Sequence, residues 1–148
     1  MKARDLMTAD PECVTSDERV TRAAEIMRDS DVGVVPVVDD HVTMRLVGII
    51  TDRDIAVRHV AGDNMSDCRV GEHMTSGRLY TVTPDDDVKV VIERMKSEQI
   101  RRIPVTEGER LVGIIAQADI ATDLDKDRET GKLVEKISEP NRQPRGQN

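Results

Sequence analysis

The sequence predicts an α/β (α+β) fold made of two similar units that follow one another along the chain. The first observation is a repeat: LVGIITDRDIA, residues 46–56, returns as LVGIIAQADIA, residues 111–121, with eight of eleven positions identical. The second is that residues 14–37 align without gaps with residues 82–105, with eight of 24 identical. The third is the composition: without Phe or Trp, aliphatic side chains must fill the core, which suits β-branched strands packed on helices.

Each copy predicts a strand, a helix, two strands and a second helix. The short first strand ends at Thr15 in one copy and at Thr83 in the other, and Ser16 is the expected N-cap of the first helix. Apolar residues of that helix repeat at i, i+3, i+4 and i+7, which places them on one helical face. The face residues are Val20, Ala23, Ala24 and Met27 in the first copy and Val88, Val91, Ile92 and Met95 in the second.

The two strands that follow carry a proline and a glycine with positional meaning. Proline cannot donate to a strand ladder, so Pro36 and Pro104 are expected at a strand edge or bulge. The glycine inside the next strand, Gly48 or Gly113, indicates that something approaches the backbone closely there. A weaker echo, RDLMT at residues 4–8 and GEHMT at residues 71–75, extends the repeat toward the start of each copy.

The charge and the apolar pattern exclude several classes of protein. A net charge of −7 argues against a nucleic-acid binder, which needs a basic surface. No apolar run reaches the length of a membrane span and the first residues lack a hydrophobic signal region, so we expect a cytoplasmic protein. Cys13 and Cys68 lack metal-ligand spacing and are expected to be free thiols, with a disulfide or redox role as the alternative.

Composition also sets the expected boundaries. The stretch between the copies is rich in Gly, Asp, Asn and Ser, and the end of the chain has two prolines and no apolar pattern. A short extra helix capped by Thr130 is expected before that end. The expected segments are unit one over 1–61, a linker over 62–69, unit two over 70–124, a C-terminal helical extension over 125–138 and a disordered tail over 139–148.

A unit that closes on a hydrophobic residue and Pro-Val, followed by two hydrophobic residues, Gly, two hydrophobic residues and T/S-x-x-D, resembles a CBS domain. Two in tandem resemble a Bateman module, and the resemblance covers roughly residues 1–124. With no catalytic domain attached, the chain is similar to stand-alone bacterial CBS-pair proteins. The resemblance implies two βαββα units packed pseudo-symmetrically through their sheets, a homodimer formed through helices, and adenine nucleotides bound in clefts between the units.

One cleft is equipped for a nucleotide. Asp54 would lie in the first turn of a helix, where its carboxylate can accept from a ribose hydroxyl, and Thr51 would lie at the strand-to-helix turn, which favours a phosphate. The resemblance implies that both face Arg101 and Arg102 of the other copy, whose guanidinium groups suit phosphate. The predicted strong cleft consists of Thr51, Arg53, Asp54, Tyr80, Val82, Arg101, Arg102, Ile103 and Pro104.

The pseudo-equivalent cleft is poorer. Ala116 replaces the threonine, and Gly33 and Val34 replace the two arginines, so this cleft keeps only the ribose acceptor Asp119. The predicted weak cleft consists of Val14, Val35, Pro36 and Asp119. We therefore expect one strong site per chain.

Structural explanations stand beside each of these assignments. Asp54 and Asp119 could simply stabilise a helix N-terminus, which contributes about 0.3–1 kcal/mol. Arg101 and Arg102 could pair with acidic residues on a solvated face, and Tyr80 could pack in the core rather than stack on a base. The strand glycines and their neighbours are expected to be mainly core and turn residues.

The sequence gives little support for catalysis. His41, His59 and His73 have no cysteine or serine in a nucleophile context, and no spacing of His or Cys indicates a metal site. We therefore expect a non-catalytic sensor or regulatory module without a metal. It would bind an adenine nucleotide, AMP or ATP, and act on a protein partner that the sequence does not identify. The alternative is a ligand-free dimeric scaffold that contacts another protein.

Overall fold

The computed structural model describes residues 1–62 and 67–130, the last four of these by their backbone alone. The predicted short helix and tail after Thr130 lie outside these residues, as does part of the predicted linker. None of the described helices is long and apolar enough to span a bilayer. The elements are α1 (Ala3–Leu6), β1 (Thr8–Ala9), β2 (Val14–Thr15), α2 (Val20–Ser30), β3 (Val34–Val38), β4 (Leu46–Thr51), α3 (Asp52–Asp54) continued by a π-helix (Ile55–Val60), a 3-10 turn (Val70–Glu72), α4 (Val88–Glu98), β5 (Arg102–Glu107), β6 (Arg110–Ala116) and α5 (Gln117–Thr130).

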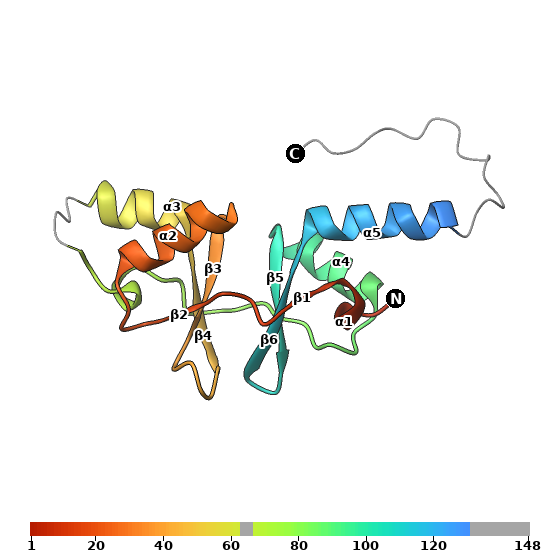
Figure 1. The fold of residues 1–148 in the computed structure, drawn as a ribbon, viewed down its shortest axis with the longest axis horizontal. Coiled ribbons are helices and arrows are strands. Elements are labelled where there is room, and N and C mark those ends of the chain that lie inside the picture. Colours follow the sequence, from red (N-terminus) through yellow and green to blue (C-terminus); the bar gives the residue numbers. More distant parts are fainter. Residues whose placement is uncertain (63–66, 131–148) are drawn as a thin grey trace.

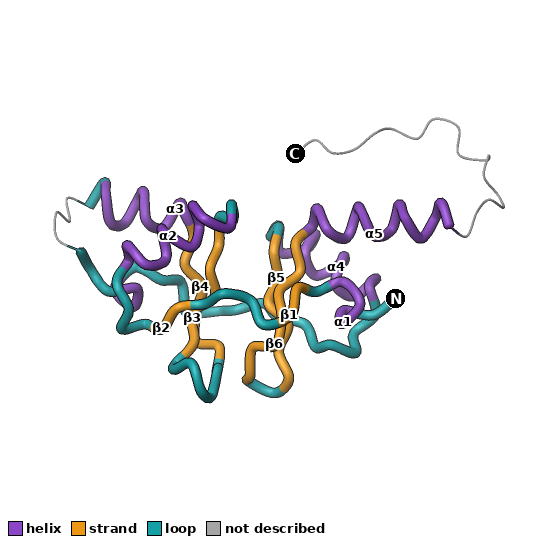
Figure 2. Tube along the Cα trace, viewed as in Figure 1, coloured by secondary structure: helices purple, strands orange, loops and turns teal. Residues whose placement is uncertain are grey.

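The strands form two three-stranded sheets, which confirms the predicted α+β class with two units. Their orders are β2-β3-β4 and β1-β6-β5, and Figures 1 and 2 show the two sheets side by side, each with its own helices. Val34 pairs with Thr51 in the first hairpin, and Arg102 pairs with Ala116 in the second. Thr51 and Ala116 therefore occupy equivalent positions at the ends of β4 and β6.

The segment that leads into each copy packs on the other unit. Thr8 in β1 pairs with Ile114 in β6, and the N–H of Ala3 donates to the carbonyl of Asp86 at 2.8 Å. Symmetrically, Thr75 and Ile49 exchange backbone hydrogen bonds of 2.8 and 3.0 Å. Each unit is thus completed by a segment that belongs, by sequence, to the other copy.

The exchanged segments, meaning the lead-in segments that pack on the other unit, explain why each strand has an interior glycine. A Cβ at Gly48 would lie 2.8 Å from the carbonyl oxygen of Thr75 and 2.9 Å from the Sδ of Met74, and the side chain of Met7 occupies the same place at Gly113. The close approach predicted from the interior glycines is confirmed, and the approaching group is the methionine–threonine pair of the exchanged segment.

Each unit has its own aliphatic core, and each core includes residues of the exchanged segments. Val70 is fully buried in the first core, and Ala3 and Leu6 are buried in the second. The first cluster contains Val14, Ala23, Ile26, Val35, Val37, Ile50 and Val70, and the second contains Ala3, Leu6, Val82, Val91, Met95, Ile103, Val105, Ile115 and Ile120. Neither half could bury its core in this way without the other.

The prediction that Ser16 caps the first helix is wrong. Helix α2 begins at Val20 with Arg19 at the N-cap position. Residues 15–18 instead form a turn, in which the N–H of Thr15 donates to the Glu18 carboxylate at 3.1 Å and the N–H of Glu18 donates to the carbonyl of Thr15 at 3.1 Å. The Glu18 carboxylate closes this turn and delays the start of the helix.

The two prolines lie where a missing N–H costs little. Pro104 lies in β5, which forms one edge of its sheet, as predicted. Pro36 lies in the middle strand β3, contrary to a strict edge position, but β2 pairs only with Val37 and Val38 and leaves that side of Pro36 without a strand partner. The first strand of the second copy is likewise short, a single bridge between Val82 and Val105.

We predict that Gly48→Ala lowers the free energy of unfolding by about 1–3 kcal/mol, because the added methyl group overpacks against a backbone oxygen that cannot rotate away. Urea denaturation would measure the change. Gly77→Ala is the matched control, since a Cβ at Gly77 meets nothing within 4 Å. Equal midpoints for the two variants would contradict the role assigned to the exchanged segment.

Candidate functional site

Thr51 and Asp54 are locked together at the turn from β4 into α3. The N–H of Asp54 donates to the Thr51 Oγ1 at 3.0 Å, and the N–H of Thr51 donates to the Asp54 Oδ2 at 3.0 Å. This reciprocal pair is a capping box, which satisfies backbone N–H groups at the start of a helix. The structural explanation offered for Asp54 therefore holds, whether or not the residue also binds a ligand.

The Asp54 carboxylate has further neighbours. The Thr75 hydroxyl donates to its Oδ2 at 3.5 Å, and the Arg58 Nε lies 3.8 Å from its Oδ1. Asp54 is only 9% exposed. A carboxylate has about four lone-pair positions, so these contacts leave capacity to accept from a ribose hydroxyl.

The equivalent turn of the second copy has no such lock. Ala116 is buried and has no hydroxyl, and Asp119 is exposed. Within the part of the chain that the structure describes, the Asp119 side chain accepts no hydrogen bond. The two copies thus differ in local structure as well as in predicted ligand groups.

Arg102 is the first residue of β5 and is half-buried, while Arg101 precedes the strand and is exposed. Over residues 1–62 and 67–126, neither side chain donates a hydrogen bond or forms an ion pair with an acidic residue. The alternative that acidic residues neutralise the two arginines is therefore not observed. As far as the described side chains extend, both guanidinium groups are available to an anion.

The strand ends that carry these residues lie at one edge of the molecule. Figure 1 shows the end of β4, where α3 begins, and the start of β5 at the same upper edge of the molecule. Among the described residues no hydrogen bond or ion pair joins Thr51, Arg53 or Asp54 to the two arginines. The cleft between these strand ends stays a prediction.

Several predicted cleft residues are buried in the cores. Val82 and Ile103 belong to the second core and are at most 2% exposed, so only their backbone atoms could contact a ligand. Tyr80 is half-buried and packs against the same core, which is the second of its two predicted roles. In the weak cleft, Val14, Val35 and Pro36 are buried as well.

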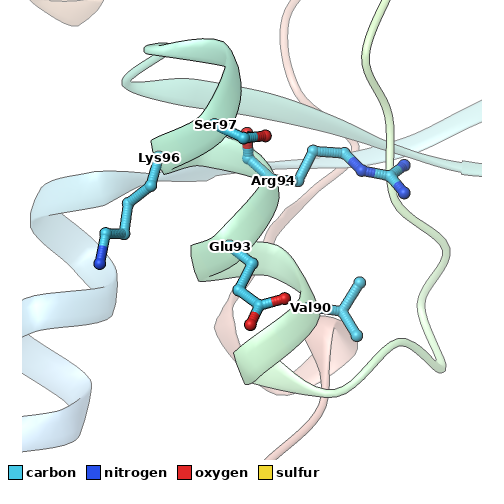
Figure 3. Close-up of a pocket in the computed structure, with 5 residues that line it drawn as sticks. All are labelled: Val90, Glu93, Arg94, Lys96 and Ser97. Carbon is cyan, nitrogen blue, oxygen red and sulfur yellow. The ribbon is translucent and has the colours of Figure 1, made fainter.

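Two surface hollows lie away from these residues. One, of about 370 Å³, is lined between the units by Arg45, Leu46, Val47, Leu79, Thr81, Thr106, Gly108 and Glu109. The other follows one side of α4, where Val90, Glu93, Arg94, Lys96 and Ser97 line it (Figure 3). No residue of the predicted clefts lines either hollow, and Arg94 is held by the carbonyl of Thr81 at 2.7 Å.

Cys13 and Cys68 form no disulfide. Burial, and then the charge of Glu18, raise the pKa of the Cys13 thiol. Because the thiolate is the reactive form, a raised pKa argues against a redox role for Cys13. The prediction of free thiols agrees with the structure.

One cluster escaped the sequence analysis. One ligand atom from each of His59, Cys68 and His73 lies within 4.8 Å of the others. The sequence predicted no such grouping, because His73 reaches the first unit only through the exchanged segment. The only local indication of a metal site in the sequence was that His73 follows Cys68 by five positions.

Comparison with known proteins gives a consistent result. A family model for the CBS domain matches residues 3–59 and 70–126. The Bacillus subtilis protein YlbB, which is uncharacterised, is 37% identical over 145 residues, or 98% of this chain and 97% of that protein. Hypoxic response protein 1 of Mycobacterium tuberculosis is 36% identical over 122 residues, or 82% of this chain and 84% of that protein.

Solved structures agree in fold. The crystal structure of Hypoxic Response Protein I with two coordinated zinc ions has a TM-score of 0.73 and 37% identity, covering 82% of this chain and 98% of that one. The CBS domain pair of protein MJ0100, in complex with 5′-methylthioadenosine and S-adenosyl-L-methionine, has a TM-score of 0.73 and 29% identity, covering 86% of this chain and 98% of that one. The two matched segments, the paired sheets and these relatives together show that the chain belongs to the CBS-domain family, as a tandem pair of CBS domains.

Proposed function

We propose that this CBS pair is a non-catalytic regulatory module that binds an adenine nucleotide such as AMP, ADP or ATP. The site would combine Thr51 and Asp54 of the first unit with Arg101 and Arg102 of the second. The observation that carries the proposal is the pair of arginines, which have no acidic partner among the described residues. A guanidinium group placed at a strand end without a protein partner is suited to a phosphate.

The adenosine part of the proposal draws support from a relative. The two ligands of the MJ0100 domain pair, 5′-methylthioadenosine and S-adenosyl-L-methionine, share an adenosyl group. Neither carries a phosphate, so a CBS pair can recognise adenosine without one. In this chain we assign the ribose to Asp54 at the start of α3, because its carboxylate has more lone-pair positions than its described contacts use.

The phosphate part rests on this chain alone. AMP differs from adenosine by a phosphate dianion, and a hydrogen bond to a charged group typically contributes about 1.5–3 kcal/mol. Arg102, at the start of β5, is half-buried, and the preceding residue Arg101 is exposed. At the other cleft Gly33 and Val34 provide no cation, so the proposal is one strong site per chain.

The first prediction separates phosphate from ribose. Arg102→Ala should weaken AMP binding by roughly 10- to 150-fold and leave adenosine binding nearly unchanged, because it removes a phosphate partner. Isothermal titration would measure both affinities. Arg28→Ala is the matched control, since it removes an exposed cation that pairs with Asp29 on α2, outside the proposed cleft. Equal losses of AMP and adenosine affinity in Arg102→Ala would contradict the assignment.

The second prediction concerns the difference between the copies. Thr51→Ala should lower AMP affinity by roughly 10- to 150-fold, and should also lower the free energy of unfolding by about 1 kcal/mol through loss of the cap. Titration and urea denaturation would measure the two effects. Ala116→Thr alone should not create a second strong site, because Gly33 and Val34 bring no cation to that cleft. Two equal sites in the parent, or AMP binding by Thr51→Ala as tight as in the parent, would favour the ligand-free scaffold.

We also propose a homodimer formed through helices. An apolar groove of about 270 Å³ runs between α4 and α5, and a second copy could cover it. Its lining residues are Ile92, Met95, Lys96, Ile100, Gln117, Ile120, Ala121 and Leu124.

The dimer is expected to show a molar mass of about twice 16.5 kDa in light scattering at micromolar concentration. Leu124→Lys should shift it toward the monomer, because a charge would be buried in the groove. Val42→Lys, a change at a residue that is 83% exposed in the first hairpin, serves as the control. A mass of 16.5 kDa for the parent, with and without AMP, would overturn the dimer.

A metal ion is the second class of ligand that we propose for the module. Hypoxic Response Protein I holds two coordinated zinc ions, and the described residues of this chain include the grouping of His59, Cys68 and His73. Since these side chains are separate from the proposed nucleotide groups, the two ligands can be tested independently.

A further inference from the structure

The grouping of His59, Cys68 and His73, here called the His-Cys-His cluster, lies on the first unit. His59 comes from the π-helix that continues α3, and Cys68 and His73 stand on either side of the 3-10 turn Val70–Glu72. One ligand atom of each lies within 4.8 Å of the others. Cys68 is 8% exposed and His73 is 7% exposed. The half-buried His59 therefore closes the cluster toward solvent.

Three hydrogen bonds hold the backbone around Cys68 and His73. The carbonyl of Cys68 accepts from the N–H of Val20 at 2.8 Å, and the N–H of Val70 donates to the carbonyl of Glu18 at 2.8 Å. The Arg58 guanidinium donates to the carbonyl of His73 at 3.2 Å. A backbone held in this way starts each ligand side chain from a fixed position, which lowers the cost of ordering the site around an ion.

The distance between the rings fits a tetrahedral metal ion. The Nδ1 of His59 and the Nε2 of His73 lie 3.3 Å apart. Two nitrogen ligands at the usual zinc distances of about 2.0–2.1 Å span about 3.3–3.4 Å in a tetrahedron. A sulfur ligand at about 2.3 Å would lie about 3.6 Å from each nitrogen. Since the Cys68 sulfur lies no more than 4.8 Å from either nitrogen, it need approach by at most about 1.2 Å.

The ligand types narrow the choice of ion. One thiolate and two imidazoles favour zinc and similar transition metals, whereas magnesium and calcium prefer oxygen ligands. No carboxylate belongs to the cluster as the described residues define it. Three protein ligands leave a fourth position, which a water molecule or a group from outside the chain would take.

The contact between the two imidazole rings also has a simpler explanation that needs no metal ion. Two imidazole rings at 3.3 Å, arranged edge to face with centroids 5.2 Å apart, could share one hydrogen bond in which one ring donates and the other accepts. That arrangement gives the Cys68 thiol no part. Involvement of the thiol is therefore the observation that distinguishes the two.

We infer that His59, Cys68 and His73 form a binding site for one divalent transition metal ion of the zinc type. This site rests on the metal part of the proposed function, for which it specifies the ligands and the type of ion. It does not depend on the nucleotide part.

The experiment is a titration of the reduced, metal-free full chain with Zn²⁺ and, in parallel, with Co²⁺. We expect one ion per chain, and with Co²⁺ a thiolate-to-metal charge-transfer band together with the ligand-field bands of a tetrahedral ion. Cys68→Ser should abolish the charge-transfer band and weaken Zn²⁺ binding by more than about 100-fold, because changes to outer-shell groups alone cost 10- to 100-fold. His59→Gln, at the most exposed ligand, should weaken Zn²⁺ strongly without disturbing the buried side.

Cys13→Ser is the matched control. Cys13 also lies near a histidine, its Sγ 3.9 Å from the His41 Nδ1, but it is not part of the cluster. This variant should keep the full charge-transfer band. Circular dichroism establishes whether each variant is folded. If Cys68→Ser does not fold, the Zn²⁺ affinity of His59→Gln tests the metal site instead.

The inference is overturned if the parent binds no Zn²⁺, if the band survives in Cys68→Ser, or if Zn²⁺ binding is unchanged in His59→Gln. A titration of the same parent with AMP reports on the nucleotide proposal separately. Binding of Zn²⁺ without binding of AMP would support the metal site and contradict the nucleotide proposal. Binding of AMP without binding of Zn²⁺ would contradict the metal site and support the nucleotide proposal.

Discussion

The close approach of a methionine–threonine pair to a strand glycine is the contact on which the rest of the structure depends. At Gly48 the backbone of Thr75 comes so near that no side chain would fit, and at Gly113 the side chain of Met7 does the same. This contact fastens the lead-in segment of each copy to the other unit. Because each core then contains residues from both copies, we expect the two units to fold as one cooperative body.

The same exchange determines which residues meet. It brings Thr75 beside the Asp54 carboxylate and brings His73 beside His59, although neither pair is close in sequence. A turn that caps a helix, a candidate nucleotide group and a candidate metal ligand are thus packed within one region of the first unit. The second unit receives the N-terminal segment instead, which repeats the threonine as Thr8 but has Leu6 at the position of His73. The difference between the copies therefore follows from what each exchanged segment contains, in addition to the loss of the Thr51 hydroxyl at Ala116.

The repeat predicted the order of strands and helices, and the resemblance to CBS domains implied how the two units pack. Identical spacing in the two copies predicted the paired strands, the buried face of α4 and the equivalence of Thr51 and Ala116. On α2 the spacing placed Ala24 on the buried face, but Ala24 is exposed and Ile26 is buried instead. The interior glycine predicted a close approach, but not the approaching group, because the sequence orders segments along the chain and does not say which unit each one joins. Ser16 was expected to cap a helix because serine often does, whereas the Glu18 side chain closes a turn first. The His-Cys-His cluster was hidden for the same reason: His73 belongs by sequence to the second copy, but its segment stays on the first unit, beside His59, before the chain crosses over.

Arg58 connects the two proposed ligand sites. Its guanidinium lies 3.8 Å from the Asp54 carboxylate, which we assign to the ribose, and donates to the carbonyls of His73 and Met74 at 3.2 and 3.4 Å. A ligand that shifts Arg58 at one site would alter its contacts at the other, and such coupling must be equal in both directions. The Arg58 side chain is 51% exposed, so solvent weakens its electrostatic contribution. The coupling should therefore fall toward the lower end of the 1–3 kcal/mol that is typical of linked sites, enough for a metal ion to adjust nucleotide affinity a few-fold without acting as an on–off switch.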